Sequence, residues 1–247
     1  MKDLLVPLNS IASLVRETEF DDALQLVSAL IGLEQFTQAF RIAVELFDFS
    51  AVQLQQARNE RDMSRAASGF YDYEVWKQKS QRFAGWQQLA ARDGALQIYH
   101  MGIVMEKIKG QLNNVPTIRE VVDSLELRTA VKLFQKYFPN YRLIRNAVAH
   151  SHNELAPSAG AFRSQTSDEI NISGLAQGRG IFITNALHGN KYIITKDKTV
   201  ASYEISNATH AKLEAVRLRF IAGFDNARAE VVKDWPKPPP WRRSNIP

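Results

Sequence analysis

The segment RNAVAH, residues 145 to 150, brings an arginine, an asparagine and a histidine close together in the chain. The Arg145 guanidinium stays charged at any working pH, and its planar fork of donors matches phosphate oxygens. The His150 imidazole titrates near neutrality, so it can take a proton from a hydroxyl or give one to a leaving oxygen. Together they would suffice to cleave RNA without a metal. The 2′-hydroxyl attacks the adjacent phosphorus, and Arg145 stabilises the charge on the phosphorane.

The spacing within this segment favours a helix–helix interface over an isolated helix. Five positions correspond to a rotation of about 140° in an α-helix, so Arg145 and His150 do not share a face. Asn146 lies four positions before His150 on the same face, where its amide could orient the imidazole. Arg145 reaches the same cleft only if the helix frays near His150, or if two copies of the segment face each other. Ala147 and Ala149 are small enough to permit that approach.

An R-N-x-x-x-H segment late in a helical bundle resembles the signature of the HEPN superfamily, whose members include ribonuclease toxins and defence nucleases. The family motif is an arginine, four to six further residues and a histidine, usually with a polar residue directly after the arginine. Arg145, Asn146 and His150 match this motif at its shortest spacing, and the resemblance extends over about residues 71–155. It implies a metal-independent endoribonuclease without a cofactor, with these three residues as its catalytic set. It also implies a site assembled from both protomers of a homodimer.

The resemblance leaves alternatives open. Some HEPN-like proteins are non-catalytic, so the second interpretation is a protein that binds nucleic acid or a nucleotide without cleaving it. The third is a helical scaffold with an accidental motif. A defence or toxin role would bring a cognate inhibitor or antitoxin as a further partner. Some toxin-type relatives carry a tyrosine two residues after the histidine, where a partner nucleotidyltransferase modifies them. His152 occupies that position here, which departs from the pattern.

Basic and aromatic residues precede the motif and are candidates for binding RNA. Residues 101–150 contain eight basic and four acidic side chains. Basic groups for phosphates and aromatic rings for base stacking are what a groove for single-stranded RNA requires. The same basic residues could equally form the solvated face of an amphipathic helix. The predicted substrate-binding residues are Lys136, Tyr141, Arg142 and His152.

A second group of polar residues lies inside the long helical pattern. Asp93 and His100 are seven positions apart and share one helix face, while Arg92, Tyr99 and Glu106 share another. We expect Arg92, Asp93, Tyr99 and His100 either to support the site or to form a structural hydrogen-bond network.

The segment HSHNE, residues 150 to 154, alternates His150, His152 and Glu154, a set that could hold a catalytic metal with an open position. No second group of ligands with helical His/Glu spacing occurs elsewhere in the chain. The sequence therefore predicts no metal site.

Composition sets wider bounds. The chain of 247 residues contains no cysteine, which excludes disulfides, thiolate nucleophiles and cysteine-based zinc sites. Residues 1–50 carry a net charge of −5 and the remaining residues +10, which suits a phosphate-rich partner. The most apolar stretch, residues 23–47, is interrupted by Glu34 and Arg41, so it predicts a core helix and not a membrane span. No export signal is recognisable, and we expect a cytoplasmic protein.

Helical periodicity dominates the first 150 residues. Thr117 and Glu120 have the spacing of a capping box, which would open a helix over TIREVVDSLE. Pro116 cannot continue the preceding helix, and Asn140 can cap the segment that contains RNAVAH. The predicted helices cover residues 21–47, about 71–112, 117–126 and about 126–138.

After residue 150 the pattern changes. Residues 151–180 are rich in Ser, Gly, Asn and Gln, which predicts a loop or flap. Residues 181–206 alternate and carry turn signals at Gly189-Asn190 and at residues 196–198, which predicts a small antiparallel meander. Ser206 or Asn207 would cap a last helix over about residues 208–233, before an extended Pro-rich tail.

The expected fold class is therefore mainly α: a HEPN-like bundle of long antiparallel helices with a small antiparallel β-meander before the C-terminal helix. The expected organisation is a single domain over residues 1–247. Its parts are the bundle (1–155), the flap and meander insertion (156–206), the C-terminal helix packed on the bundle (207–233) and the tail (234–247).

Overall fold

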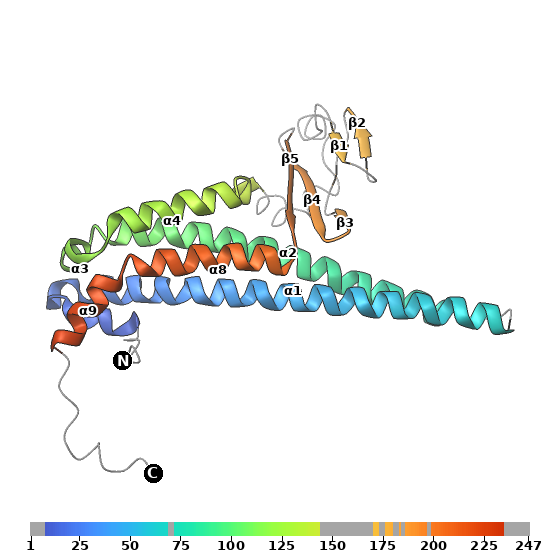
Figure 1. The fold of residues 1–247 in the computed structure, drawn as a ribbon, viewed down its shortest axis with the longest axis horizontal. Helices are drawn as coiled ribbons and strands as arrows, with labels where there is room; N and C mark the ends of the chain where they lie inside the picture. Colours follow the sequence, from blue (N-terminus) through green and yellow to red (C-terminus); the bar gives the residue numbers. More distant parts are fainter. Residues whose placement is uncertain are drawn as a thin grey trace, which may run out of the picture.

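Helices form most of the protein, and a small antiparallel sheet precedes the C-terminal helices (Figure 1). This arrangement confirms the prediction of a mainly α chain with a β-meander before its C-terminal helix. The computed structural model describes residues 8–68, 72–143, 170–172, 176–179, 183, 186–196 and 199–234.

Two long antiparallel helices, α1 (Phe20–Ser68) and α2 (Tyr73–Gln111), form the backbone of the fold. The bounds of α2 agree with the prediction to within two residues, and Asp72 caps it by accepting hydrogen bonds from the amides of residues 74 and 75. The first helix was predicted to end at Phe47 but continues for 21 more residues. Its last part is rich in Gln, Arg and Ala, which are good helix formers.

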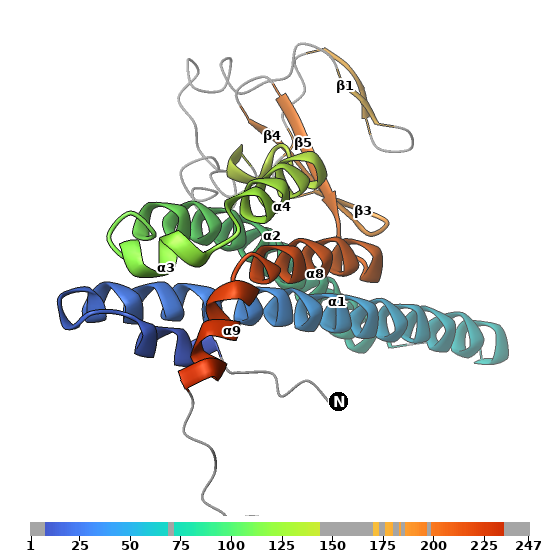
Figure 2. The ribbon, with the colours of Figure 1, turned by 60° about the vertical axis from the view of Figure 1, so that its left-hand side comes forward.

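The extra length of α1 packs against the first half of α2 and makes a two-helix projection. We call residues 48–68 of α1 together with residues 73–89 of α2 the arm. Figure 1 shows the arm extending beyond all the other elements, and Figure 2 shows the same from a second direction.

The predicted capping box at Thr117 and Glu120 is wrong. Helix α3 (Pro116–Val121) begins at Val115 without a side-chain cap. The Thr117 hydroxyl and amide instead donate to the Glu19 carboxylate, at 3.0 and 3.3 Å. Tertiary contact with a distant residue has replaced the local motif. Pro116 stands at the first helical position, where its missing N–H costs nothing.

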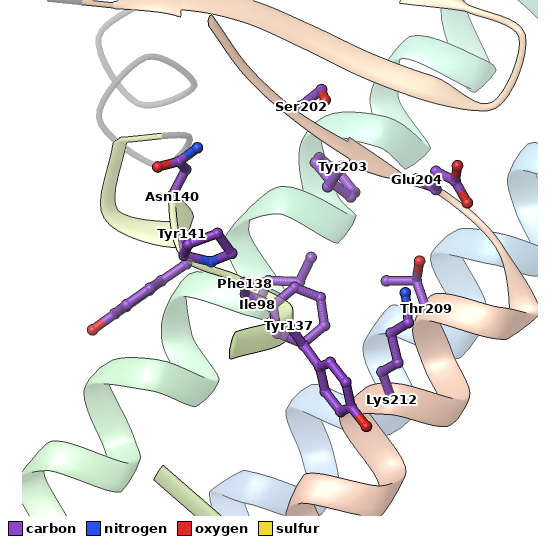
Figure 3. A pocket seen from close by; sticks show the side chains of 11 residues that line it. Ile98, Tyr137, Phe138, Asn140, Tyr141, Ser202, Tyr203, Glu204, Thr209 and Lys212 are labelled. Carbon is purple, nitrogen blue, oxygen red and sulfur yellow. The ribbon is translucent and has the colours of Figure 1, made fainter. Parts of the chain in front are cut away.

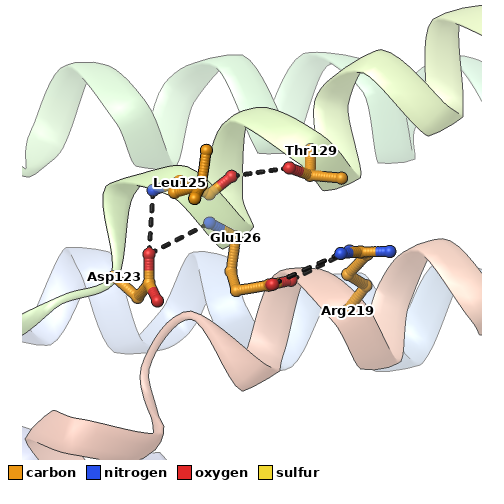
Figure 4. Close-up of polar contacts among 5 residues, drawn as sticks. All are labelled: Asp123, Leu125, Glu126, Thr129 and Arg219. Carbon is orange, nitrogen blue, oxygen red and sulfur yellow. Dashed lines mark hydrogen bonds and ion pairs between the residues drawn. The ribbon is translucent and has the colours of Figure 1, made fainter.

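The cap of the next helix was not predicted. In α4 (Ser124–Tyr137), Asp123 accepts hydrogen bonds from the amides of Leu125 and Glu126, at 2.9 and 3.1 Å (Figure 4). This cap starts α4 two residues earlier than predicted. It also ends the expected TIREVVDSLE helix, because Asp123 has extended backbone. Glu126 then pairs with Arg219, with a shortest N–O distance of 2.9 Å.

The predicted meander is confirmed. Strands β3 (Ala186–His188), β4 (Lys191–Lys196) and β5 (Thr199–Glu204) form an antiparallel sheet in the order β3-β4-β5. Gly189 has a φ of 58° at the first turn, as the Gly189-Asn190 signal required.

A second hairpin was missed. Strands β1 (Ile170–Ile172) and β2 (Ala176–Gly178) pair antiparallel inside residues 151–180, where only a loop was predicted. Three residues per strand are too few for an alternating pattern to stand out in the sequence.

The C-terminal helix is two helices. α8 (Asn207–Ala222) begins at the predicted Ser206 cap, and α9 (Asp225–Asp234) follows a turn at Gly223 and Phe224. The Gly223 carbonyl accepts a hydrogen bond from the amide of Asp123 at 2.8 Å. A Cβ at Gly223 would lie 2.7 Å from Leu127, so only glycine permits this approach of α8 to α4.

The core lies between α1, α2, α4 and α8. Its largest fully buried side chains include Phe40, Ile98, Met101 and Phe220. Figures 1 and 2 place α1 on the side of the bundle away from α4, with α2 and α8 between them. The 3-10 helices η1 (Leu8–Leu14) and η2 (Glu17–Glu19), which were not predicted, precede α1, and η1 contacts α1 and α9. Within the described residues, no helix has the length and apolar character needed to cross a membrane.

Candidate functional site

A pocket of about 170 Å³ opens where the end of α4 meets strand β5 and the first turn of α8. Its lining mixes aromatic rings with an amide, hydroxyls, a carboxylate and an ammonium group (Figure 3). Tyr137, Asn140 and Lys212 supply groups able to stack and to hydrogen-bond. The complete lining is Ile98, Tyr137, Phe138, Pro139, Asn140, Tyr141, Ser202, Tyr203, Glu204, Thr209 and Lys212.

Strand β5 is held against the bundle by Tyr203. Its hydroxyl donates to the backbone carbonyl of Ala91 on α2, and its ring lies 5.7 Å from that of Tyr192. Burial raises the pKa of Tyr203 well above its usual value, so the phenol stays protonated as a donor. Gly94 leaves room for the hydroxyl, since a Cβ there would lie 3.2 Å from it.

The opposite wall comes from the first turn of α8. The Ser206 hydroxyl accepts a hydrogen bond from the amide of Thr209 at 3.2 Å and thereby starts the helix. One turn later, the Lys212 ammonium lies 5.8 Å from the centre of the Tyr137 ring, within the range of a cation–π contact. The Ser206 cap fixes where α8 begins and therefore where Lys212 lies relative to Tyr137.

The segment that follows α4 is tied to α2 by three polar side chains, Tyr141, Arg142 and Glu106. Tyr141 donates to the Glu106 carboxylate at 2.9 Å, and Arg142 donates to both oxygens of the same carboxylate at 2.6 Å. The Arg142 Nε group also donates to the Tyr141 hydroxyl at 3.0 Å. In Figure 3 the Tyr141 ring points away from the other side chains of the pocket.

The charges of this cluster support one another. Burial opposes ionisation of Glu106, but the hydrogen bonds from Arg142 and Tyr141 outweigh it and hold the pKa of Glu106 below its usual value. The bond to Glu106 raises the pKa of Arg142. Burial, followed by the hydrogen bond to Glu106 and its charge, raises the pKa of Tyr141. All three groups therefore keep one protonation state across the neutral range.

Gly102 on α2 allows the end of α4 to come this close. A Cβ at this position would lie 2.5 Å from the Tyr141 ring and 2.7 Å from the Phe134 ring. Real Cβ atoms do not approach other atoms so closely, so any other residue would force the two rings to move. Gly102 was not singled out in the sequence, because a glycine inside a helical pattern does not reveal what packs on it.

The predicted catalytic residues Arg145, Asn146 and His150 lie outside the described residues, as does His152. Of the other predicted substrate-binding residues, Tyr141 is buried and Arg142 is paired with Glu106. Lys136 is exposed on α4, in line with two further exposed basic residues that stand four positions apart. This row on α4 is Arg128, Lys132 and Lys136.

The predicted support residues Asp93, Tyr99 and His100 on α2 contact different neighbours. Asp93 accepts a hydrogen bond from Gln97 at 2.9 Å, and the His100 ring stacks on Phe36 with ring centres 5.4 Å apart. Tyr99 lies between the His100 and Tyr141 rings, 5.5 and 6.3 Å away.

Arg92 has a buried Nε group with no hydrogen-bond partner in the described part of the chain. Arg92, Tyr99 and Glu106 were predicted to share one helix face. Of these, Tyr99 and Glu106 both contact Tyr141. Glu106 was recognised only as a member of that face. Lys212, Ser202 and Glu204 were missed, because nothing local in the sequence marks them as neighbours of α4.

The described residues contain no group of three or more His, Asp or Glu side chains placed to hold a metal ion. The HSHNE segment lies outside those residues.

Comparison of the chain with known protein families, with curated proteins and with solved structures finds no significant match.

Proposed function

We propose that the protein is a metal-independent endoribonuclease in which Arg145, Asn146 and His150 act on RNA held at the pocket beside α4. The observation that carries the proposal is the position of this pocket in the chain. Its wall includes residues 137–141, and RNAVAH begins four residues after Tyr141. A polar, aromatic pocket therefore stands directly before the segment whose chemistry suits RNA cleavage.

The size and lining of the pocket suit part of a nucleotide. A cavity of about 170 Å³ is smaller than the roughly 300–1,000 Å³ of pockets that enclose whole small molecules. One base or ribose is of the right order. Tyr137 offers a ring for stacking, and Asn140 offers an amide that can both donate and accept hydrogen bonds.

The row of basic residues on α4 supplies the electrostatic part of binding. Arg128, Lys132 and Lys136 are exposed and lie on one face of α4. Exposed cations at this spacing attract a phosphate backbone without reading its sequence. The row ends one residue before Tyr137, which lines the pocket, but it lies on a different face of α4 from Tyr137, so RNA bound along it would have to turn around the end of α4 to enter the pocket.

The proposed reaction forms a bond between the 2′-oxygen and phosphorus and breaks the bond from phosphorus to the 5′-oxygen. His150 accepts the proton of the 2′-hydroxyl and returns a proton to the 5′-oxygen, leaving a 2′,3′-cyclic phosphate and a 5′-hydroxyl. Arg145 stabilises the phosphorane, and Asn146 orients the imidazole. The protein is unchanged at the end of the cycle.

The test is incubation of the purified protein with mixed single-stranded RNA in excess EDTA. We expect cleavage products that end in 2′,3′-cyclic phosphate, and loss of cleavage in Arg145→Ala and His150→Ala. The matched controls are Arg82→Ala on the arm and His188→Ala on β3, which should cleave like the wild type. Equal inertness of all five proteins with retained RNA binding would favour the non-catalytic alternative. No cleavage and no binding would refute both.

A mixing experiment addresses the composite site that the HEPN resemblance implies. Arg145→Ala and His150→Ala are combined after each has been shown to be inactive. Recovery of part of the wild-type rate requires that one copy supplies Arg145 and the other His150. No recovery, with an active wild type, means that each copy works alone.

A further inference from the structure

Helix α1 exposes a line of large apolar side chains along its entire length. Seven such residues are between 40 and 65% exposed, although their types are normally buried. At 100° per residue, all seven fall within a sector of about 80° of the helix surface. We call them the α1 stripe: Phe20, Leu24, Ile31, Ile42, Phe49, Val52 and Met63.

The α1 stripe is separate from the face of α1 that forms the core. Leu30, Leu33 and Phe40 are fully buried and face the bundle. Single exposed apolar residues are ordinary, but seven of them in one sector of a helix mark an interaction surface. The apolar side chains of the stripe follow one another at intervals of three to eleven residues, with polar residues between them.

The spacing of the stripe is nearly symmetric about Ile42. Ile31 and Val52 lie 11 and 10 residues from it, and Phe20 and Met63 lie 22 and 21 residues from it. A two-fold axis near Ile42 would therefore bring five of the seven apolar positions of two antiparallel α1 helices opposite one another, whereas Leu24 and Phe49 would face Glu60 and Gln35. A two-fold interface requires a surface that is complementary to itself, and these five positions meet that requirement.

The polar positions within the stripe do not bring like charges directly opposite one another, because a two-fold axis at Ile42 sets Glu34, Glu45 and Glu60 opposite residues 50, 39 and 24. Gln38 and Gln56 lie in the same sector and carry no charge, so they do not repel their own copies. Glu45 is paired with Arg41 of the same helix at 3.0 Å. Glu60 is paired with Lys79 at 2.9 Å.

Helix α2 widens the stripe on the arm. Trp86 stacks beside Phe49 with ring centres 6.2 Å apart and is 36% exposed. Leu89, one turn further along α2, is 58% exposed. Aromatic side chains of this kind contribute most of the binding energy in protein interfaces.

If the two helices stay in contact over the whole stripe, the area reaches the lower limit for a specific interface. From Phe20 to Met63 the stripe runs for about 65 Å at 1.5 Å per residue. Two packed helices touch over a width of about 10 Å, so each copy would bury on the order of 600 Å². Specific interfaces begin at roughly 600 Å² on each partner.

We propose that two copies of the chain pair antiparallel through the α1 stripe, with Ile42 next to the two-fold axis. This proposal rests on the α1 stripe and its neighbours on α2 and does not depend on RNAVAH. Figure 2 shows α1 on the side of the bundle away from α4. Because the pocket lies at the end of α4, we expect this dimer to leave each pocket open and apart from its copy. Recovery of activity on mixing would therefore require a second interface, and its absence agrees with the α1 dimer.

The first experiment compares the mass of the full chain in solution, by sedimentation equilibrium, with that of Ile42→Arg. We expect a dimer for the wild type and a dissociation constant at least about tenfold weaker for the variant, because two arginines would meet at the axis. The matched control is Leu125→Arg, which changes an apolar side chain on α4 that is 69% exposed and outside the stripe. It should dimerise like the wild type. Circular dichroism confirms that both variants are folded.

The second experiment uses the absence of cysteine from the chain. Ile42→Cys should form a disulfide-linked dimer under mild oxidation, and Leu125→Cys should not. A mixture of Ile31→Cys and Val52→Cys should cross-link to each other more than either does to itself, since only antiparallel pairing brings these positions together. A monomeric wild type, or a dimer that Ile42→Arg leaves intact, overturns the proposal.

Discussion

The α1–α2 hairpin consists of the arm and of the rest of both helices, residues 20–47 and 90–111, which we call the base. The base and the arm differ in what covers them. In the base, α4 and α8 complete a core around Phe40, Ile98 and Met101, which are at most 1% exposed. In the arm, α1 and α2 pack on each other, and Val52, Met63 and others remain at least half exposed. The pocket lies entirely beside the base. Stability and the candidate site therefore depend on the base, while the arm offers surface.

The largest contrast is expected between two phenylalanines of α1. Phe40→Ala removes a fully buried ring and should destabilise the protein by about 3–5 kcal/mol, because the densely packed base cannot collapse into the cavity. Phe49→Ala removes a ring that is 50% exposed on the arm and should cost less than about 1.5 kcal/mol. Urea unfolding of both variants measures the difference, and similar losses would mean that the arm is as well packed as the base.

Two glycines of α2 provide the second contrast. Gly102→Ala should destabilise the protein by about 1–3 kcal/mol, because its Cβ would overlap the Tyr141 and Phe134 rings. Gly85→Ala on the arm should stabilise it by about 0.5–1 kcal/mol, because nothing lies within 4 Å and alanine favours a helix. Thermal unfolding should move the two midpoints in opposite directions. A shift in the same direction would contradict the close packing at Gly102.

The acid dependence of stability sharpens the comparison within the base. The folded protein holds the pKa of Glu106 below its usual value, so this group stabilises the fold above the unfolded pKa of about 4.5. That contribution is lost as the pH falls through the lowered pKa. Glu106→Gln should be less stable than the wild type at neutral pH, and the difference should shrink below pH 4.5. A constant difference in urea unfolding from pH 7 to pH 3 would contradict this role.

The smallest effect is expected for an ion pair on the arm. Lys79 and Glu60 are 47 and 59% exposed, so their contact is screened by water. Glu60→Gln should change the free energy of unfolding by no more than about 0.5 kcal/mol. Addition of salt should leave the variant and the wild type equally stable. A larger loss would show that the arm depends on its ion pairs.

Local signals in the sequence predicted several elements well. The period of α2, the Gly189-Asn190 turn and the Ser206 cap depend on residues that are near one another in the chain, and all three are confirmed. The meander was recognised because its longer strands alternate over enough residues. These features are decided within a few neighbouring positions, where propensity and capping chemistry act.

Other elements required distant partners. Glu19 takes the hydrogen bonds that a capping box at Thr117 would have used, and α8 ends next to Gly223, whose carbonyl accepts a hydrogen bond from the amide of Asp123. The prediction of one C-terminal helix failed because periodicity continues through the break. No local pattern indicates which glycine a distant side chain will contact.

The sequence by itself determined the period of α2, the Gly189-Asn190 turn, the Ser206 cap, and the RNAVAH chemistry that makes RNA the proposed substrate. Tertiary structure alone decided that Tyr141 and Arg142 donate hydrogen bonds to Glu106 and that Lys212 lies over the Tyr137 ring. It also decided that the Tyr141 and Phe134 rings pack against Gly102. It also decided which apolar residues of α1 remain exposed, because periodicity marks a helix face as apolar without saying what covers it. The physical reason is the same in each case. Short-range preferences are encoded in neighbouring residues, whereas burial and pairing depend on which distant segments the fold brings together.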